Sequence, residues 1–489
     1  RTTLPAGVAA EVSILRAQPA TRRHYVDLEG VVWGDATAVD AALAGWRARG
    51  YPKVEAIEEG TVLGIAGRVI DNREYRIALP VSSAAQASRR VAEVYKRFGT
   101  RASARARLAE RPWAELSVRV GGAPTGRATS FVRFVATGGS ITIDAVEYGA
   151  GYSWHGFESR TFHGEIYVVA DPDGALAVVN LLGAETVLAG VVPSELFPSS
   201  PPEALKAQAI AARNQLLAKL SKRHHDDPFH LCSSQHCQVY GGITKEDPRT
   251  TAAVEATTGE AAFLGGRLVD TVYSSTCGGH TEDNDAVWGN APNPALRGRP
   301  DFDAAALPEL VTYADGITEE NIEAWLTARP QTYCARAPLA RPKNFRWKKT
   351  LGAADLKRLL APRFEWIGEL QSIEIDARGH GGRVISLRLV GDRNEATIVH
   401  ELPIRRLFGN LSSGALLIDH HRSSTGRLLG VTFIGGGWGH GVGMCQLGAT
   451  GRAESGQTYR EILAHYYNGS TVEHLYSTPE LHVEARGQR

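Results

Sequence analysis

The sequence of 489 residues contains no uninterrupted run of about 18 apolar residues, so it offers no candidate for a membrane-spanning helix. Its first residues, RTTLPAGVAAEVSILRAQ, lack the basic segment followed by an apolar segment that marks an export signal. Two interpretations of location stay open: the chain is cytoplasmic, or it faces the cell envelope after a signal or anchor has been removed.

An excess of charge of either sign is also missing, because 54 Lys and Arg residues balance 53 Asp and Glu residues to a net charge of +1. Electrostatic binding of nucleic acid needs a surface of clustered cationic residues, so no nucleic-acid partner is expected. With 43% hydrophobic residues, a chain of this length can form two or three domains with cores of their own.

Cysteine is scarce, and the count of five leaves at least one thiol unpaired in any intramolecular disulfide scheme. Two cysteines, Cys232 and Cys237, lie in the segment CSSQHCQVYGG, where His236 directly precedes the second. Cys334 and Cys445 are interpreted as ordinary buried thiols.

From His24 to about Val120 the pattern alternates between extended and helical segments, in two strand-helix-strand halves. We therefore predict that residues 1–120 form a small ferredoxin-like α+β module. The layout resembles the SPOR domain, which binds peptidoglycan glycan strands, and a generic α+β packing domain is the alternative interpretation.

The rest of the chain is rich in strand patterns, so a mixed α+β, strand-rich core is expected. The turn sequence DPDG between two β-branched runs predicts a hairpin, and GGAPTGRATS is typical of a linker. The predicted divisions are a linker and strand-rich segment (121–160), the first part of the core (161–302), an inserted hairpin-bearing subdomain (303–420) and the C-terminal part of the core (421–489).

Glu195 lies in PSELFPSSPP, between a valine-rich run read as a strand and a helix for which Ser200 is the predicted N-cap. Four prolines stiffen this loop, and the neighbouring Leu196 and Phe197 could desolvate the carboxyl and raise its pKa, as a general acid requires. The alternative is that Glu195 only complements the dipole of the following helix.

Four segments in this order resemble the SpoIID/LytB family, whose name comes from sporulation stage II protein D. They are the helix EALKAQAIAAR after Glu195, HCQVYGG, VYSSTCGGHTEDNDAVWG, and GGGWGHGVGMCQLGATGRAESGQTYREILAHYYNG. The resemblance covers roughly residues 160–475 and implies a SpoIID-like catalytic core.

The resemblance implies a lytic transglycosylase that cleaves MurNAc-GlcNAc bonds in peptidoglycan strands lacking stem peptides. It implies that Glu195 is the catalytic acid and then base, and that the muramic acid's C6 hydroxyl is the nucleophile, which gives a 1,6-anhydro product. An extracytoplasmic location and a cell-wall amidase as partner follow from the same resemblance.

Several polar and aromatic residues in the matched segments are predicted to bind substrate. Arg213 could hold an acidic group through a bidentate contact, and a structural ion pair is its alternative. Ser274 and Ser275 suit sugar hydroxyls, and a polar strand-to-loop transition is their alternative. Trp438 could stack on a sugar ring, and His440 could bond substrate or Glu195; for these two, packing and satisfaction of a buried backbone group is the alternative. The remaining predicted substrate-binding residues are Gln208, Gln238, Tyr240 and Gln446.

Zinc is the predicted metal, in a structural or cleft-positioning role, since some family members share the C…HCQ arrangement and thiolates with imidazoles suit this ion. The predicted ligands are Cys232, His236, Cys237 and Cys277, with His230 and His280 as substitutes. The alternative is a disulfide from Cys237 to Cys232 or to Cys277 in an oxidising envelope.

Two other functions stay open. A non-catalytic glycan-binding protein that stimulates an amidase is the first alternative. The second is a cysteine-nucleophile enzyme in which a histidine activates Cys237 or Cys277. Its activity would be lost when the thiols are alkylated and would be retained in Glu195→Gln.

Overall fold

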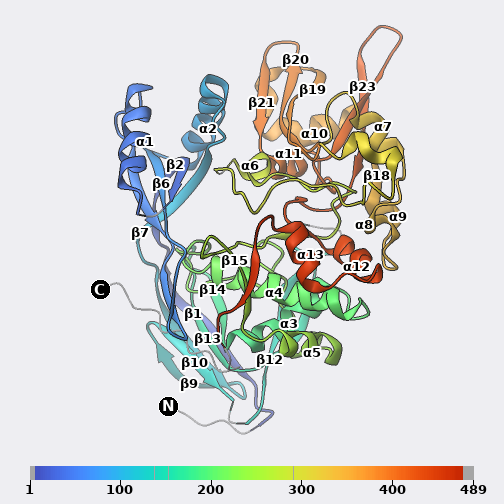
Figure 1. Cartoon of the computed structure of the whole chain (residues 1–489). Helices are drawn as coiled ribbons and strands as arrows, with labels where there is room; N and C mark the ends of the chain where they lie inside the picture. Colours follow the sequence, from blue (N-terminus) through green and yellow to red (C-terminus); the bar gives the residue numbers. More distant parts are fainter. Residues whose placement is uncertain (1–5, 33, 137, 152–153, 290, 477–489) are drawn as a thin grey trace.

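A computed structural model of the chain describes residues 6–32, 34–136, 138–151, 154–289 and 291–476. The structure is of the mixed, strand-rich α+β class, as predicted. It is built from many small, mostly antiparallel sheets. In Figure 1 the elements β2, α1, β6 and α2, and the segment around β19 to β23, form two upper lobes above a layer of helices. Within the described residues, no helix is long and apolar enough to cross a membrane.

The N-terminal lobe has the β-α-β-β-α-β order that the alternating pattern predicts. Its antiparallel sheet has the strand order β3-β6-β2-β7, and Trp46 and Val94 from the two helices are buried against it. Asp35 and Ser83 cap the two helices at their N-termini. The elements are β2 (Thr21–Val32), α1 (Ala36–Ala48), β3 (Glu55–Glu59), β6 (Glu74–Val81), α2 (Ala84–Phe98) and β7 (Ser103–Glu110).

A hairpin of β4 (Val62–Ile65) and β5 (Arg68–Asp71) leaves this lobe and packs on the core. Its apolar residues share a buried cluster with Leu217 and Phe263. The Nδ2 atom of Asn72 donates to the carbonyls of Leu217, Ala218 and Leu220, at the C-terminal end of helix α4. Because carbonyls at a helix end lack partners within the helix, this side chain ties the N-terminal lobe to α4.

Next along the chain is a stack of small sheets that Ala114, Leu116 and Ala170 join in one apolar cluster. The predicted DPDG hairpin is present between β13 and β14. The segment predicted as a linker instead forms a tight turn at Gly121 and Gly122, both with positive φ, followed by a strand paired with β8. The strands are β1 (Ala10–Gln18), β8 (Trp113–Val120), β9 (Ala123–Ala128), β10 (Phe131–Val135), β11 (Ile141–Tyr148), β12 (Gly156–Phe162), β13 (Glu165–Ala170) and β14 (Leu176–Leu181).

The central layer is helical around α4, which is buried on nearly all sides. The valine-rich run before Glu195, expected to be a strand, is helix α3, because Leu188, Val191 and Val192 form one helical face against Ala209 of α4. The elements are α3 (Ala184–Glu195), α4 (Pro202–Ala218), η1 (Ile243–Lys245), α5 (Pro248–Ala256), β15 (Glu260–Leu264), β16 (Arg267–Leu268), β17 (Tyr273–Ser274), β24 (Met444–Cys445), α12 (Gln446–Glu454), α13 (Tyr459–Tyr466) and β25 (Thr471–His474).

The predicted N-cap of α4 also differs, because the cap position is Pro201 and Ser200 makes no capping bond there. The rings of Pro201 and Pro202 fix the backbone φ angles of this turn. Because proline has no polar side chain, the helix begins without a side-chain acceptor for its first N–H groups.

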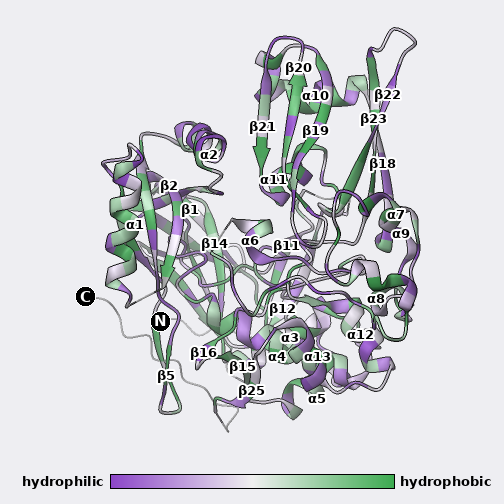
Figure 2. Ribbon diagram, turned by 45° about the horizontal axis from the view of Figure 1, so that its top comes forward, coloured by the Kyte–Doolittle hydropathy of each residue, from purple (hydrophilic) through white to green (hydrophobic). Residues whose placement is uncertain are grey.

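The second upper lobe contains two three-stranded sheets, β19-β20-β21 and β18-β23-β22, around the fully buried Leu387, Phe408 and Phe433. Figure 2 shows hydrophobic residues along β19, β20 and β21. The predicted hairpin is present as β19 paired with β20. The elements between the central layer and this lobe, and within it, are α6 (Asn284–Trp288), η2 (Pro308–Tyr313), α7 (Ile322–Thr327), α8 (Tyr333–Arg336), α9 (Pro342–Phe345), β18 (Arg346–Gly352), α10 (Ala353–Phe364), η3 (Glu365–Ile367), β19 (Leu370–Arg378), β20 (Val384–Gly391), β21 (Glu395–Val399), α11 (Glu401–Leu407), β22 (Leu416–Arg422) and β23 (Leu428–Gly436).

Candidate functional site

Glu195 is the last residue of α3, and its side chain is half-buried. The backbone N–H of Val239 donates a hydrogen bond to its Oε1 atom. Gln446 Nε2 donates to the Glu195 backbone carbonyl at 2.9 Å. Segments far apart in the sequence therefore fix the position of one carboxyl group: the end of α3, the HCQVYGG segment and the start of α12.

Burial raises the pKa of Glu195 from 4.5 to about 7, although the hydrogen bonds from Val239 and Gln446 and the charge of Lys219 oppose the shift. Of the two apolar neighbours expected to desolvate the carboxyl, Leu196 is buried, whereas Phe197 is exposed. A carboxyl group with a pKa near neutrality is partly protonated at pH 7 and can both give and take a proton there.

Buried amide and phenol groups surround this carboxyl. Gln446 Nε2 also lies 3.3 Å from Gln208 Oε1, and Tyr273 donates to Gln238 Oε1 at 2.9 Å. The negative charge of Glu195 contributes to raising the pKa of Tyr273, for which burial is the main cause. The structure thus brings together the predicted residues Gln208, Gln238 and Gln446 around Glu195, and it adds Tyr273.

Lys219 is a further charged residue of this region that the sequence patterns did not single out. It is buried at the C-terminal end of α4, where its ammonium donates to Gln215. Burial lowers its pKa, and the charges of Asp270 and Glu195 are among the groups that oppose this shift. A buried cation of this kind favours the ionised form of the Glu195 carboxyl.

Two glycine-rich segments lie side by side next to these residues. Thr276 and Trp438 exchange two backbone hydrogen bonds, of 3.2 and 2.8 Å, and Ser274 Oγ accepts from Gly441 N at 3.1 Å. Gly437 has a φ of +85°, and a Cβ atom there would lie 2.7 Å from the Thr276 carbonyl oxygen. The expected tight turns are present, and the Ser274 hydroxyl is used for backbone contact.

His440 packs against Trp288 and bonds a backbone N–H, as its alternative interpretation proposed. Its Nδ1 atom accepts from Val442 N at 3.0 Å, and its ring lies 5.0 Å from that of Trp288. Burial lowers its pKa to about 3, so the ring is neutral at pH 7. Ser275 is half-buried, and its carbonyl accepts from Leu447 N.

Trp438 lines a pocket of about 300 Å³ together with Trp154. Their ring centroids lie 6.3 Å apart with the planes 35° from parallel, and Trp154 is 48% exposed. Lys349, Arg405 and Asn410 supply polar groups to the same pocket. Aromatic rings with a few polar groups suit the apolar faces and hydroxyls of sugars. Trp154 was not predicted, because no motif marks its exposed position.

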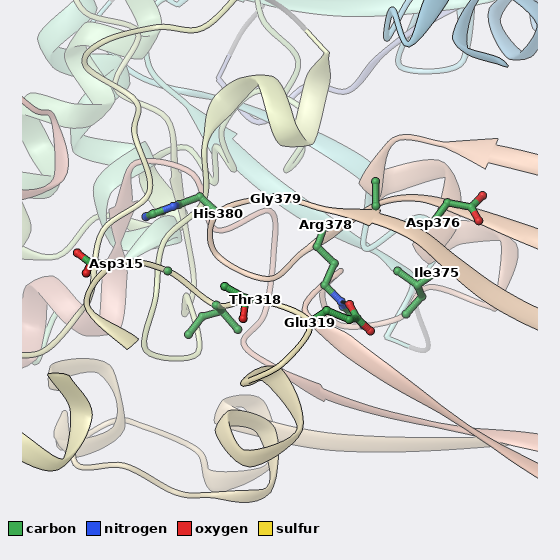
Figure 3. Close-up of a pocket in the computed structure, with 11 residues that line it drawn as sticks. Asp315, Thr318, Glu319, Ile375, Asp376, Arg378, Gly379 and His380 are labelled. Carbon is green, nitrogen blue, oxygen red and sulfur yellow. Dashed lines mark hydrogen bonds and ion pairs between the residues drawn. The ribbon is translucent and has the colours of Figure 1, made fainter. Parts of the chain in front are cut away.

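A larger pocket, of about 450 Å³, lies between residues 315–319 and 375–380 (Figure 3). Arg378 pairs there with Glu319. None of the predicted site residues lines it, so its size alone does not connect it with the chemistry of Glu195.

Arg213 does not face a substrate. It is fully buried and forms a bidentate ion pair with Glu185, with both distances 2.7 Å, and it donates to the Glu260 carbonyl at 3.1 Å. The predicted substrate role therefore gives way to the structural alternative, since all of these contacts lie inside the protein. Tyr240 likewise points inward, donating to Asn180 Oδ1 at 2.9 Å and packing on Phe162.

Three of the four predicted zinc ligands lie together, and His224 completes the group. The ligand atoms of His224, Cys232, His236 and Cys237 lie within 4.8 Å of one another, and all five cysteines are free thiols. Two thiols and two imidazoles form a donor set that fits tetrahedral zinc.

Cys277 is placed elsewhere, in a separate group with Asp301, Cys334 and Cys445. It differs from the prediction because its loop follows β17, which pairs with β24 and thus draws Cys277 toward Cys445. The substitute ligands lie outside both groups, and buried His280 bonds the Thr281 carbonyl and faces His380. The sequence signal for His224 is the segment HHDD at residues 224–227, which lies close to the two cysteines along the chain.

Parts of this chain resemble known protein families and curated proteins. The family model of the SpoIID domain, described as stage II sporulation protein, matches residues 172–263, and a domain of unknown function, DUF8618, matches residues 282–443. The chain therefore carries a SpoIID domain. The matched segment contains Glu195, α4 and the cysteine-histidine group.

Among curated proteins the chain is 29% identical over 304 residues to the amidase enhancer of Bacillus subtilis, which covers 58% of this chain and 40% of that protein. It is 26% identical over 310 residues to stage II sporulation protein D of the same species, covering 60% and 75%. An uncharacterized protein of Brachyspira hyodysenteriae is 29% identical over 324 residues, covering 66% and 74%. The chain is distantly homologous to stage II sporulation protein D and to the amidase enhancer, and the predicted family resemblance is confirmed.

The buried pair of Arg213 and Glu185 generates a stability prediction. Arg213→Ala leaves the largely buried Glu185 carboxylate without its cationic partner, although Tyr476 still donates to it, so the free energy of unfolding should fall by about 3–5 kcal/mol. Lys206→Ala is the matched control on the same helix, because its pair with Glu203 is partly exposed and should be worth less than about 1 kcal/mol. Urea unfolding of both variants measures the difference; equal effects would contradict the structural role.

Proposed function

We propose that this chain is a peptidoglycan lytic transglycosylase that cleaves MurNAc-GlcNAc bonds in glycan strands lacking stem peptides. The observation that carries the proposal is the Glu195 carboxyl, whose pKa is raised by burial to about 7 and whose Oε1 atom is held by Val239 N–H. The match of residues 172–263 to the SpoIID domain supports the proposal, because the sequence resemblance implies this reaction for the matching glutamate.

In this proposal Glu195 acts twice. Its protonated form donates a proton to the glycosidic oxygen as the bond to C1 of MurNAc breaks. The resulting carboxylate then removes the proton from the C6 hydroxyl of the same sugar, whose oxygen attacks C1 and closes the 1,6-anhydro ring. An ordinary glycosidase needs two carboxyl groups because water or a carboxylate attacks, whereas here the substrate supplies its own nucleophile.

The surroundings of Glu195 suit these two steps. Val239 N–H stabilises the carboxylate after proton donation. The proton taken from the C6 hydroxyl then restores the protonated form, which burial favours. Trp154 and Trp438 would contact sugar rings, and Lys349 in their pocket would attract the lactyl carboxylates that strands without stem peptides expose.

The group of His224, Cys232, His236 and Cys237 would hold a structural zinc ion. Cys237 lies two residues before Val239, so an ion bound there would fix the amide that contacts Glu195.

The proposed location is extracytoplasmic, where the glycan strands are, and the N-terminal lobe would add glycan-binding surface.

The similarity to the amidase enhancer favours a second candidate function. In this alternative the chain binds glycan strands without cleaving them and stimulates a cell-wall amidase. Glu195 would then contribute to binding or packing only.

Product analysis separates these candidates. Glycan strands first stripped by an amidase should yield soluble 1,6-anhydroMurNAc fragments with the wild-type chain, and Glu195→Gln should release at least about 100-fold less, because it removes the acid and base. Glu255→Gln, at an exposed carboxylate on α5, is the matched control and should retain wild-type activity. Mass spectrometry detects the fragments. Strand binding by the wild-type chain without any release would favour the enhancer function.

The raised pKa also predicts a pH-dependent difference in stability. The folded chain holds a proton on Glu195 up to about pH 7, whereas the unfolded chain loses it near 4.5, so ionisation of Glu195 lowers stability as pH rises through this window. Glu195→Gln cannot ionise, so relative to the wild type it should gain about 1–3 kcal/mol between about pH 4 and pH 8. Urea unfolding across this range tests the expectation, which a pH-independent difference would contradict.

A further inference from the structure

A second group of metal-ligating side chains is built from four separate segments. Cys277 follows β17, Asp301 lies in the following loop, Cys334 is on α8, and Cys445 is the N-cap of α12. Their ligand atoms lie within 4.8 Å of one another, and all four side chains are buried. Nothing in the proposed chemistry of Glu195 uses them.

The spacing of the sulfur atoms fits one tetrahedral ion. The Sγ atoms of Cys277 and Cys334 are 3.8 Å apart. Two thiolates on one zinc ion, with bonds of about 2.3 Å at the tetrahedral angle, lie about 3.8 Å apart. A disulfide would require a separation of about 2.05 Å.

Backbone N–H groups are directed at the sulfur atoms, as they are around metal-bound thiolates. Cys445 Sγ accepts from Cys277 N at 3.2 Å and from Gly448 N at 3.3 Å, and Cys277 Sγ accepts from Gly279 N at 3.4 Å. The Asp301 carboxylate is oriented in the same way by Tyr466 Oη at 2.6 Å and Cys334 N at 3.0 Å. The ligand atoms are therefore held in place by a surrounding layer of donors.

Two buried guanidinium groups adjoin the cluster. Arg346 donates to four backbone carbonyls, one of which belongs to Gly278, the residue after Cys277. Arg452 Nε lies 3.5 Å from Asp301 Oδ1. Buried cations require compensating negative charge. Three thiolates and one carboxylate around a divalent cation carry two negative charges, which the two guanidinium groups balance.

We propose that Cys277, Cys334, Cys445 and Asp301 bind one zinc ion as a structural centre, separate from the group around Cys232 and Cys237. Cys445 directly precedes Gln446, which contacts Glu195, and Cys277 directly follows Thr276, which is paired with Trp438. The ion therefore joins α8 and α12 to the loop after β17. It positions Gln446 and Thr276, the residues next to two of its ligands. This inference does not depend on the proposed reaction.

The test uses the full chain carrying Cys232→Ser and Cys237→Ser, which removes the other group and leaves all four proposed ligands intact. After purification and dialysis against zinc, metal analysis should find one zinc per chain, and X-ray absorption at the zinc edge should show three sulfur neighbours. A chain without zinc would overturn the proposal. A disulfide among the three remaining cysteines, detected as a mass lower by about 2 Da, would overturn it as well.

A further substitution in this background identifies the ligands. Cys334→Ser should weaken zinc binding at least tenfold, measured by competition with a chelator, while the circular dichroism spectrum stays that of the parent. Unchanged affinity would exclude Cys334 as a ligand. If Cys334→Ser fails to fold, the zinc content and sulfur count of the parent variant decide the proposal on their own.

Discussion

The carboxyl group of Glu195 is held between two opposing influences: burial, which favours its protonated form, and the N–H of Val239, which favours its ionised form. Each neighbouring element affects this balance. Helix α3 ends at the residue, the cysteine-histidine segment supplies the amide, α12 supplies Gln446, and α4 supplies Lys219. A small shift of any of these segments would change how readily the group gives and takes a proton.

The helix α4 carries much of this arrangement, and the chain stabilises it from several sides. Asn72, from the N-terminal lobe, satisfies carbonyls at its C-terminal end, and Arg213 binds the start of α3 through Glu185. The N-terminal lobe is thus a supporting element of the central layer. The buried cysteines lie next to α12, where the proposed ion would complete the support.

Much of the fold could be predicted from local patterns. The alternating strands and helices of the N-terminal lobe, the DPDG hairpin and the family motifs all carry their information in neighbouring residues. Helix α3 was missed because its valines suit a strand by propensity, and only their packing on α4 makes the segment helical. The role of Arg213 depended on Glu185, 28 residues away, so its residue type alone left the ion pair and the substrate contact equally open.

The cysteines show the same limit. The close spacing of Cys232, His236 and Cys237 predicted that they lie together. Cys277 and Cys445 are brought together by the pairing of β17 with β24, and Cys334 joins them because α8 packs on α12; no local pattern specifies either contact. Trp154 and Lys219 were missed for a similar reason, since each belongs to the site only through its neighbours in space.

The pKa of Glu195 tests this account most directly. It can be measured by following the side-chain carboxyl carbon of ¹³C-labelled glutamate by NMR as the pH is changed, with the resonance assigned by its loss in Glu195→Gln. A midpoint near pH 7 is the expected result, because burial outweighs the stabilising contacts. A midpoint near 4.5, the ordinary value for glutamate, would show a solvated carboxylate and contradict its role as an acid at neutral pH.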